Sequence, residues 1–92
     1  MKKFKIITVD KVDEVDGRHI MIEGVSCFTH KDGYLGFIVS HMETGASICH
    51  EVTRKRAIQI AKGIIKKANF KKAVKLMKER IIKRRIKLPL NP

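Results

Sequence analysis

The sequence predicts an α+β fold, in which a three- to four-stranded antiparallel β-meander precedes two C-terminal α-helices, the first packed on the sheet. Positions 1–51 contain short runs of β-branched and aromatic residues separated by turn residues. After Thr53, apolar residues recur every three or four positions, which is the period of an amphipathic helix. A chain of 92 residues supports one small core. We therefore expect a single domain with a sheet half (1–51), a basic helical half (52–88) and a tail (89–92).

Turn residues define the predicted strands. Asp16-Gly17 has the form of a two-residue hairpin turn, and Lys31-Asp32-Gly33 and Thr44-Gly45 supply two further turns. Gly24 interrupts a longer β-rich run. Before it the residues expected to face inward have even numbers, and after it they have odd numbers, which predicts a bulge or bend at Gly24. The resulting strands are Phe4–Val9, His19–His30, Tyr34–His41 and, as a short fourth strand, Ala46–His50, with Asp10–Gly17 as a polar connection.

Two helices are expected in the second half. Thr53 is a suitable N-cap for the first, and Asn69 separates it from the second. Pro89 and Pro92 follow the second helix, which we expect to run to about Lys87. A single helix from Thr53 to Lys87 is the alternative, since Gly63 and Asn69 are modest interruptions; we favour the break. The apolar stripes are Ala57, Ile60, Ala61, Ile64, Ile65 and Ala68 in the first helix, and Phe70, Ala73, Val74, Met77 and Ile81 in the second.

Charge divides sharply along the chain, whose formal net charge is +12. Up to Glu51 there are six Lys and Arg residues against eight Asp and Glu residues, whereas after it there are fifteen against Glu79 alone. The composition is too apolar for a disordered basic tail, and no apolar run is long enough to span a membrane. A cationic stretch of this kind favours a polyanionic partner, and nucleic acid is the leading candidate.

In the second predicted helix, many Lys and Arg residues stand three or four positions apart, with one acid among them. Their positive charges are therefore expected to repel one another. Arg54-Lys55-Arg56 opens the first helix, where free N–H groups and the helix dipole favour a phosphate and disfavour basic side chains. Both features indicate binding to an external anion. The expected phosphate-contacting residues are Arg54, Lys55, Arg56, Lys71, Lys75, Lys78, Arg84 and Arg85.

The segment Thr53-Arg54-Lys55-Arg56-Ala57, which follows the strands, resembles the start of the final helix of a double-stranded-RNA-binding domain. The resemblance covers about Tyr34 to Ile65 and implies contacts from the basic residues to phosphates across a groove. The chain lacks the first helix of such domains and the loop that they insert in the neighbouring minor groove. A three-stranded sheet packed on one helix is also similar to the small domains that integrases lay in the DNA major groove. Both are likenesses of shape.

Contacts to phosphates carry no sequence information, so we expect largely sequence-tolerant binding to DNA or RNA. The chain has no Trp, and its aromatic residues are Tyr34 and four Phe. Tyr34 is the candidate for stacking on a base. Proteins that specialise in single strands usually offer more stacking platforms, which favours a duplex or otherwise structured nucleic acid.

Catalysis and metal binding have little support in the sequence. Asp10, Asp13, Glu14 and Asp16 cluster in an expected loop, without the spacing of a calcium site. The Cys and His residues lack the tight spacing of zinc ligands, and no orienting group for a Cys–His nucleophile can be identified. We expect no enzyme, no cofactor and, with two reduced cysteines and no export signal, a cytoplasmic protein. The cysteines and histidines in question are Cys27, His30, His41, Cys49 and His50.

A protein-binding module is the alternative function. An accessory or inhibitor protein of the phage or mobile-element type could use the cationic helix to dock on an acidic partner surface. Ile82 and Ile86 fall outside the main apolar stripe, near the basic face, and are candidates for a partner or homodimer contact.

Overall fold

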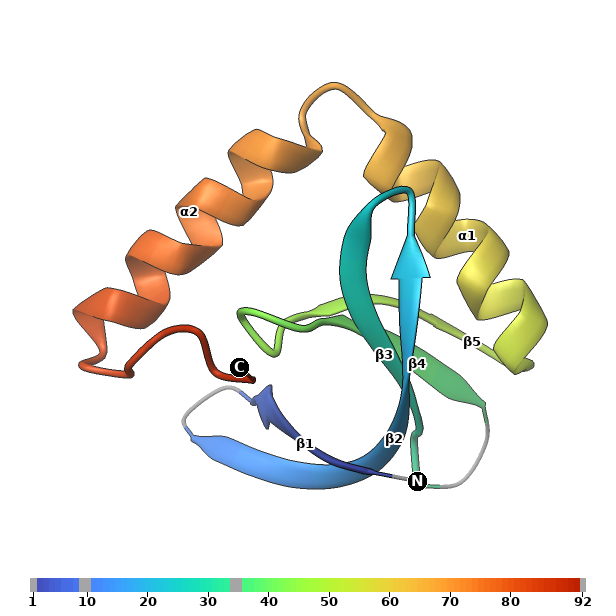
Figure 1. Cartoon of the computed structure of the whole chain (residues 1–92), viewed down its shortest axis with the longest axis horizontal. Helices are drawn as coiled ribbons and strands as arrows, with labels where there is room; N and C mark the ends of the chain where they lie inside the picture. The colour runs from blue at the N-terminus through green and yellow to red at the C-terminus, as the bar shows by residue number, and fades with distance from the viewer. Residues whose placement is uncertain (1, 9–10, 34–35, 92) are drawn as a thin grey trace.

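The computed structural model describes residues 2–8, 11–33 and 36–91 and contains a five-stranded antiparallel sheet followed by two helices (Figure 1). The strands follow one another in the sheet in chain order, as in a meander. The α+β class and the order of elements are therefore confirmed, with one strand more than the upper number predicted. The elements are β1 (Lys2–Ile7), β2 (Val12–Ile22), β3 (Val25–Lys31), β4 (Phe37–His41), β5 (Ser47–Glu51), α1 (Arg54–Lys66) and α2 (Phe70–Lys83).

The predicted turn at Asp16-Gly17 is wrong, because both residues lie inside β2, the longest strand. Gly17 is required there for close approach: a Cβ atom would lie 2.7 Å from the carbonyl oxygen of Thr29 and 3.1 Å from the Phe4 ring. The turn instead falls at Glu23-Gly24, where φ is 50° and 78°, as a type I′ hairpin requires. The predicted strand His19–His30 is therefore two strands joined by this turn.

The sheet curls so far that its first strand meets the β4–β5 turn. The N–H of Ile7, at the end of β1, donates to the carbonyl oxygen of Gly45 at 3.0 Å. Inside the curl, the rings of Phe4 and Phe28 stack with their centroids 4.5 Å apart. This cluster forms a second small core on the face of the sheet opposite α1, since Phe28 and its neighbour Cys27 point to opposite sides of β3.

The main core lies between the sheet and α1. Ala57 and Ala61 are fully buried, and their small side chains let the helix lie close to the strands. They pack with Ile22, Cys27 and Val39 from three strands. Thr53 is confirmed as the N-cap, because its Oγ1 accepts a hydrogen bond from the backbone N–H of Arg56 at 3.2 Å.

The break between the helices is also confirmed, at residues 67–69, whereas α2 ends four residues before the predicted Lys87. Arg85 adopts a left-handed conformation (φ 61°). The N–H of Ile86 then bonds to the carbonyl of Ile81, and the N–H of Arg85 to that of Ile82. This pair of bonds is the Schellman motif, which satisfies the last carbonyls and turns the chain out of the helix.

The C-terminal tail returns to the sheet. The N–H of Leu90 donates to the carbonyl of Glu43 at 2.7 Å, and the Leu90 side chain is buried. Asn91 bonds to both the N–H and the carbonyl of Lys5, and its Nδ2 also donates to the carbonyl of Met42. The far end of α2 is thus tied to β1 and the β4–β5 turn by the residues that follow it.

Candidate nucleic-acid interface

Five lysines gather around one cleft between α2 and the tip of the β2–β3 hairpin. The cleft has a volume of about 790 Å³, and Glu23 is the carboxylate in its lining. Lys71, Lys75 and Lys78 come from one flank of α2, since they stand at i, i+4 and i+7. Lys66 and Lys67 come from the end of α1 and the break that follows it. We call this site the lysine cleft and define it by Lys66, Lys67, Lys71, Lys75 and Lys78.

The nearby carboxylates neutralise only part of this charge. Glu23 Oε1 lies 3.6 Å from Lys62 Nζ and 3.7 Å from Lys66 Nζ. Glu43 Oε1 lies 2.6 Å from Lys78 Nζ. Among the described residues, Lys67, Lys71 and Lys75 have no acidic partner within ion-pair distance. The lysine cleft therefore keeps a net positive charge at neutral pH.

Neither helix compensates its basic first turn. The first turns of α1 and α2 contain no acidic residue. In α2 the second helical position is Lys71, where the positive end of the helix dipole disfavours a cation. Asn69 also makes no side-chain capping bond to α2. The first turn of α2 therefore contains uncompensated lysines, and Lys71 among them lines the same cleft.

His41 lies at the floor of the lysine cleft. Its Nδ1 is 2.9 Å from Thr44 Oγ1, and its ring meets the Phe70 ring edge-on with the centroids 6.4 Å apart. Burial lowers the pKa of His41; the carboxylate of Glu43 opposes this shift, and the ammonium group of Lys78 adds to it. At neutral pH the floor is therefore an uncharged imidazole, and the positive charge of the cleft comes from its lysines.

The predicted contact residues occupy three separate places. Lys71, Lys75 and Lys78 meet in the lysine cleft, whereas Arg84 and Arg85 follow the far end of α2. Figure 1 shows that the start of α1 and the end of α2 lie at opposite sides of the molecule. The structure thus brings three of the predicted residues together and leaves Arg54, Lys55 and Arg56 at a distance.

Two of the three basic residues that open α1 are engaged within the fold. Arg54 Nε donates to Thr29 Oγ1 at 3.1 Å, which holds this side chain against the sheet. Arg56 Nε lies 3.4 Å from Glu51 Oε1. Lys55 is exposed. Phosphate binding by this segment stays a prediction, with Lys55 the residue best placed for it.

Lys66 and Lys67 were not among the residues expected to bind. In the sequence they end the first predicted helix, and only the angle between α1 and α2 brings them to the same cleft as Lys71. Their position directly before the predicted break at Asn69 could have identified them. Where the chain changes direction between two helices, the charged residues before and after the break come close together.

The cysteines and histidines do not converge. The pKa of the Cys27 thiol is raised to about 11, mainly by burial and to a lesser extent by the neighbouring Cys49. Cys27 is therefore an unreactive core residue. His30 lies on the opposite face of the sheet, where its Nε2 is 3.0 Å from Ser40 Oγ and burial lowers its pKa. Within the described part of the chain, no three His, Cys, Asp or Glu side chains come together as metal ligands.

The acidic cluster is not a loop, because Asp13, Glu14 and Asp16 lie on β2. Asp16 pairs with Lys3 at 2.8 Å. Asp10 and Tyr34, including the predicted stacking role of Tyr34, fall outside the described residues. Over the residues that are described, neither helix is long and apolar enough to cross a membrane.

The chain matches no protein-family model, no curated protein and no solved structure.

Proposed function

We propose that this protein binds nucleic acid through the phosphates, largely without regard to sequence, and that the lysine cleft is the centre of the interface. The observation that carries the proposal is that five lysines converge on one cleft, where Glu23 and Glu43 pair with two of them. Clustered like charges cost folding free energy, and a polyanion that enters the cleft relieves this cost.

Binding of this kind works by releasing counterions from the nucleic acid. Each lysine that meets a phosphate displaces condensed cations, so the affinity falls steeply as salt rises. Long, flexible lysine side chains act as point charges, which suits phosphate contact better than base recognition. We expect duplex or otherwise structured DNA or RNA as the target, and Lys55, Arg84 and Arg85 as outlying contacts.

Two double variants of equal charge test the site. Lys71→Glu with Lys75→Glu reverses two lysines of the lysine cleft, whereas Lys72→Glu with Lys83→Glu makes the same change outside it. Lys72 and Lys83 stand three turns apart and share another side of α2. The cleft variant should weaken binding by roughly tenfold or more at low salt and lower the salt slope by about 1 per lysine. The control should bind nearly as the wild type does.

The measurement is fluorescence anisotropy with labelled random-sequence duplex DNA and duplex RNA at two salt concentrations. Equal loss of affinity in both double variants would show that bulk charge, and not the lysine cleft, governs binding. No binding of the wild type even at low salt would overturn the proposed function.

A protein partner is the second candidate, and Ile82 is the observation that favours it. Its side chain is 60% exposed and lies on the same flank of α2 as Lys75 and Lys78. An apolar residue among cations suits an acidic protein surface with an apolar centre. Ile86, in contrast, is half-buried at the Schellman motif and is less available for such a contact. Ile82→Ser should weaken protein binding and leave nucleic-acid binding unchanged.

We place this binding function in the cytoplasm and assign no catalytic step to it. Cys27 and Cys49 are free thiols, which fits a reducing compartment. Cys27 is buried, and Cys49 is half-buried with its Sγ 3.1 Å from the carbonyl oxygen of Ala57.

A further inference from the structure

A second hollow continues the lysine cleft across the molecule. It has a volume of about 770 Å³ and shares Val25 and His41 with the lysine cleft. We call it the hairpin pocket and define it by His19, Val25, Ser26, His41 and Lys2, which are among the residues that line it. Because the two hollows have residues in common, they adjoin each other, and together they extend from the break between the helices to the start of β1. We call the two hollows together the path.

The two sides of this path differ in chemistry. The α2 side presents Lys71, Lys75 and Lys78. The hairpin side presents the imidazole of His19. Met21 lines neither hollow but lies two residues further along the same face of β2, beside them. The residues of β2 and β3 that line the hairpin side, His19, Val25 and Ser26, carry no cation. Lys2 and Lys3 lie at the β1 end of the hairpin pocket, and the acids in the lining of the two hollows are Glu23 and Glu43.

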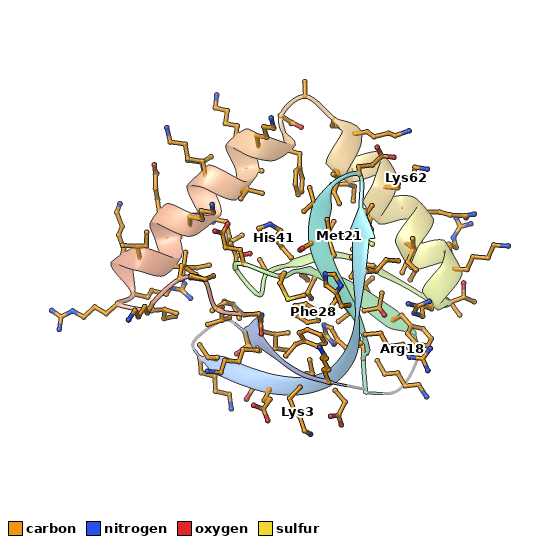
Figure 2. All side chains as sticks on the ribbon, in the orientation of Figure 1. Lys3, Arg18, Met21, Phe28, His41 and Lys62 are labelled. Atoms are coloured by element: carbon orange, nitrogen blue, oxygen red, sulfur yellow. The ribbon has the colours of Figure 1, made fainter. Side chains whose placement is uncertain are left out.

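Met21 is an exposed apolar side chain with a fixed environment. It is 55% exposed, although Ile20 and Ile22 beside it pack toward α1. Ser26 Oγ donates to Met21 Sδ at 3.1 Å and lies 3.4 Å from His19 Nε2. Figure 2 shows Met21 on the hairpin and His41 between the hairpin and α2. The hairpin thus offers a polarisable thioether and a ring side by side, which are suitable surfaces for a flat aromatic ligand.

We propose that the path binds one unpaired strand of a structured nucleic acid, with its phosphates toward α2 and its bases toward His19 and Met21. A duplex keeps its bases stacked inside and carries phosphates on both sides of each groove, so it would leave the cation-free hairpin side without a partner. An unpaired strand has phosphates along one edge and free base faces along the other. That asymmetry matches the two sides of the path.

The ends of the path support the same assignment. Lys66 and Lys67 lie at the end next to the break between the helices, and Lys2 and Lys3 lie at the other. A strand that crosses the floor at His41 would therefore meet cations before and after the segment whose bases stack. This inference rests on the proposed function, and it narrows the target from duplex or otherwise structured nucleic acid to the unpaired segments of a structured nucleic acid.

The test compares a single strand, a blunt duplex of the same sequence and a hairpin with an unpaired overhang, in both DNA and RNA form, by anisotropy at low salt. The wild type should bind the single strand and the overhang more tightly than the blunt duplex. His19→Ala with Met21→Ala should weaken single-strand binding by about tenfold, the scale of losing a base stack, and leave duplex binding unchanged. Val52→Ala, another exposed apolar residue outside the path, is the control.

The outcomes separate this inference from the proposed function. Equal or tighter binding of the blunt duplex, with single-strand affinity unaffected by the His19 and Met21 changes, would overturn the unpaired-strand inference and leave phosphate binding in place. No binding of any of these oligonucleotides would overturn both. Because His19 and Met21 are exposed, unchanged melting curves should show that the double variant is folded.

Discussion

The two helices have similar lengths and similar basic compositions, but the fold uses them differently. α1 buries Ala57, Ala61 and Ile65, has a capping bond from Thr53, and has three of its cations paired with acids. α2 buries only Ile81 among its described residues, has no side-chain cap, and has one paired lysine. The charge of α1 is therefore partly neutralised by Glu51 and Glu23, whereas in α2 one lysine, Lys78, is paired with an acid among the described residues.

The two helices also differ in how they are held to the rest of the protein. An amphipathic helix gains most of its stability from packing, as α1 does. α2 packs through a narrow stripe and is held at its far end by the tail and by the ion pair between Lys78 and Glu43. Lys71 and Lys75, which stand one turn apart in α2, repel each other. Such an arrangement is expected where a helix surface is used for binding and not for packing.

The largest effect should come from truncating the buried side of α1. Ile65→Ala removes a side chain from the main core, and we expect the free energy of unfolding to fall by about 2–5 kcal/mol. Ile82→Ala, the matched change on α2, should alter it by about 0.5 kcal/mol or less because the side chain is largely exposed. Urea denaturation measures both. Similar losses at the two positions would contradict the contrast between the helices.

A smaller effect, of opposite sign, is expected at the hairpin turn. Glu23 has a φ of 50°, which Asn tolerates better than Glu, and it is the carboxylate of the lysine cleft. Glu23→Asn should strengthen nucleic-acid binding several-fold, and the exposed ion pairs that it loses are worth about 0–1 kcal/mol. Anisotropy and thermal melting report the two quantities. Weaker binding in this variant would mean that Glu23 positions the cleft and does not oppose it.

The smallest effect is a dependence of stability on pH. Burial lowers the pKa of both His30 and His41 below the ordinary value of 6.5. As pH falls, these histidines therefore take up protons in the unfolded chain before they do so in the folded protein. Their contribution to the free energy of unfolding is fully present above pH 6.5. It declines as pH falls from 6.5 toward the lower pKa values of the folded state. Charged neighbours modify these values: Asp32 raises that of His30, Glu43 raises that of His41, and Lys78 lowers it.

Urea denaturation across this pH range checks the prediction. His30→Gln should flatten part of the decline, because it removes one of the two groups. A stability that rises as pH falls below 6.5 would contradict the burial of these imidazoles in neutral form.

The sequence predicted the fold well wherever local signals agreed with packing. The helical period after Thr53, its capping role and the break before Phe70 are all properties of neighbouring residues, and all three are confirmed. The turn predicted at Asp16-Gly17 was wrong because Gly17 allows close contact with Phe4, a residue thirteen positions away, and does not form a turn. Contacts of that kind have no local signature.

The candidate site was predictable in kind but not in extent. The excess of lysines on the second helix is visible in the sequence, and Lys71, Lys75 and Lys78 share a flank by their spacing alone. The contributions of Lys66, Lys67, His19 and Met21 depend on how far α2 swings away from α1 and on the side to which the hairpin points. These are tertiary properties, as are the contacts of Leu90 with Glu43 and of Asn91 with Lys5 that tie the tail to the sheet.

Lys71→Glu provides the most direct test that the charge of α2 serves an external polyanion. It places an acid in the first turn of α2, four residues before Lys75, and should raise the free energy of unfolding by about 0.5–1 kcal/mol. The same change should weaken nucleic-acid binding. Lys72→Glu, at the next position, should also stabilise the helix but largely preserve binding. Greater stability together with wild-type affinity in Lys71→Glu would contradict the account.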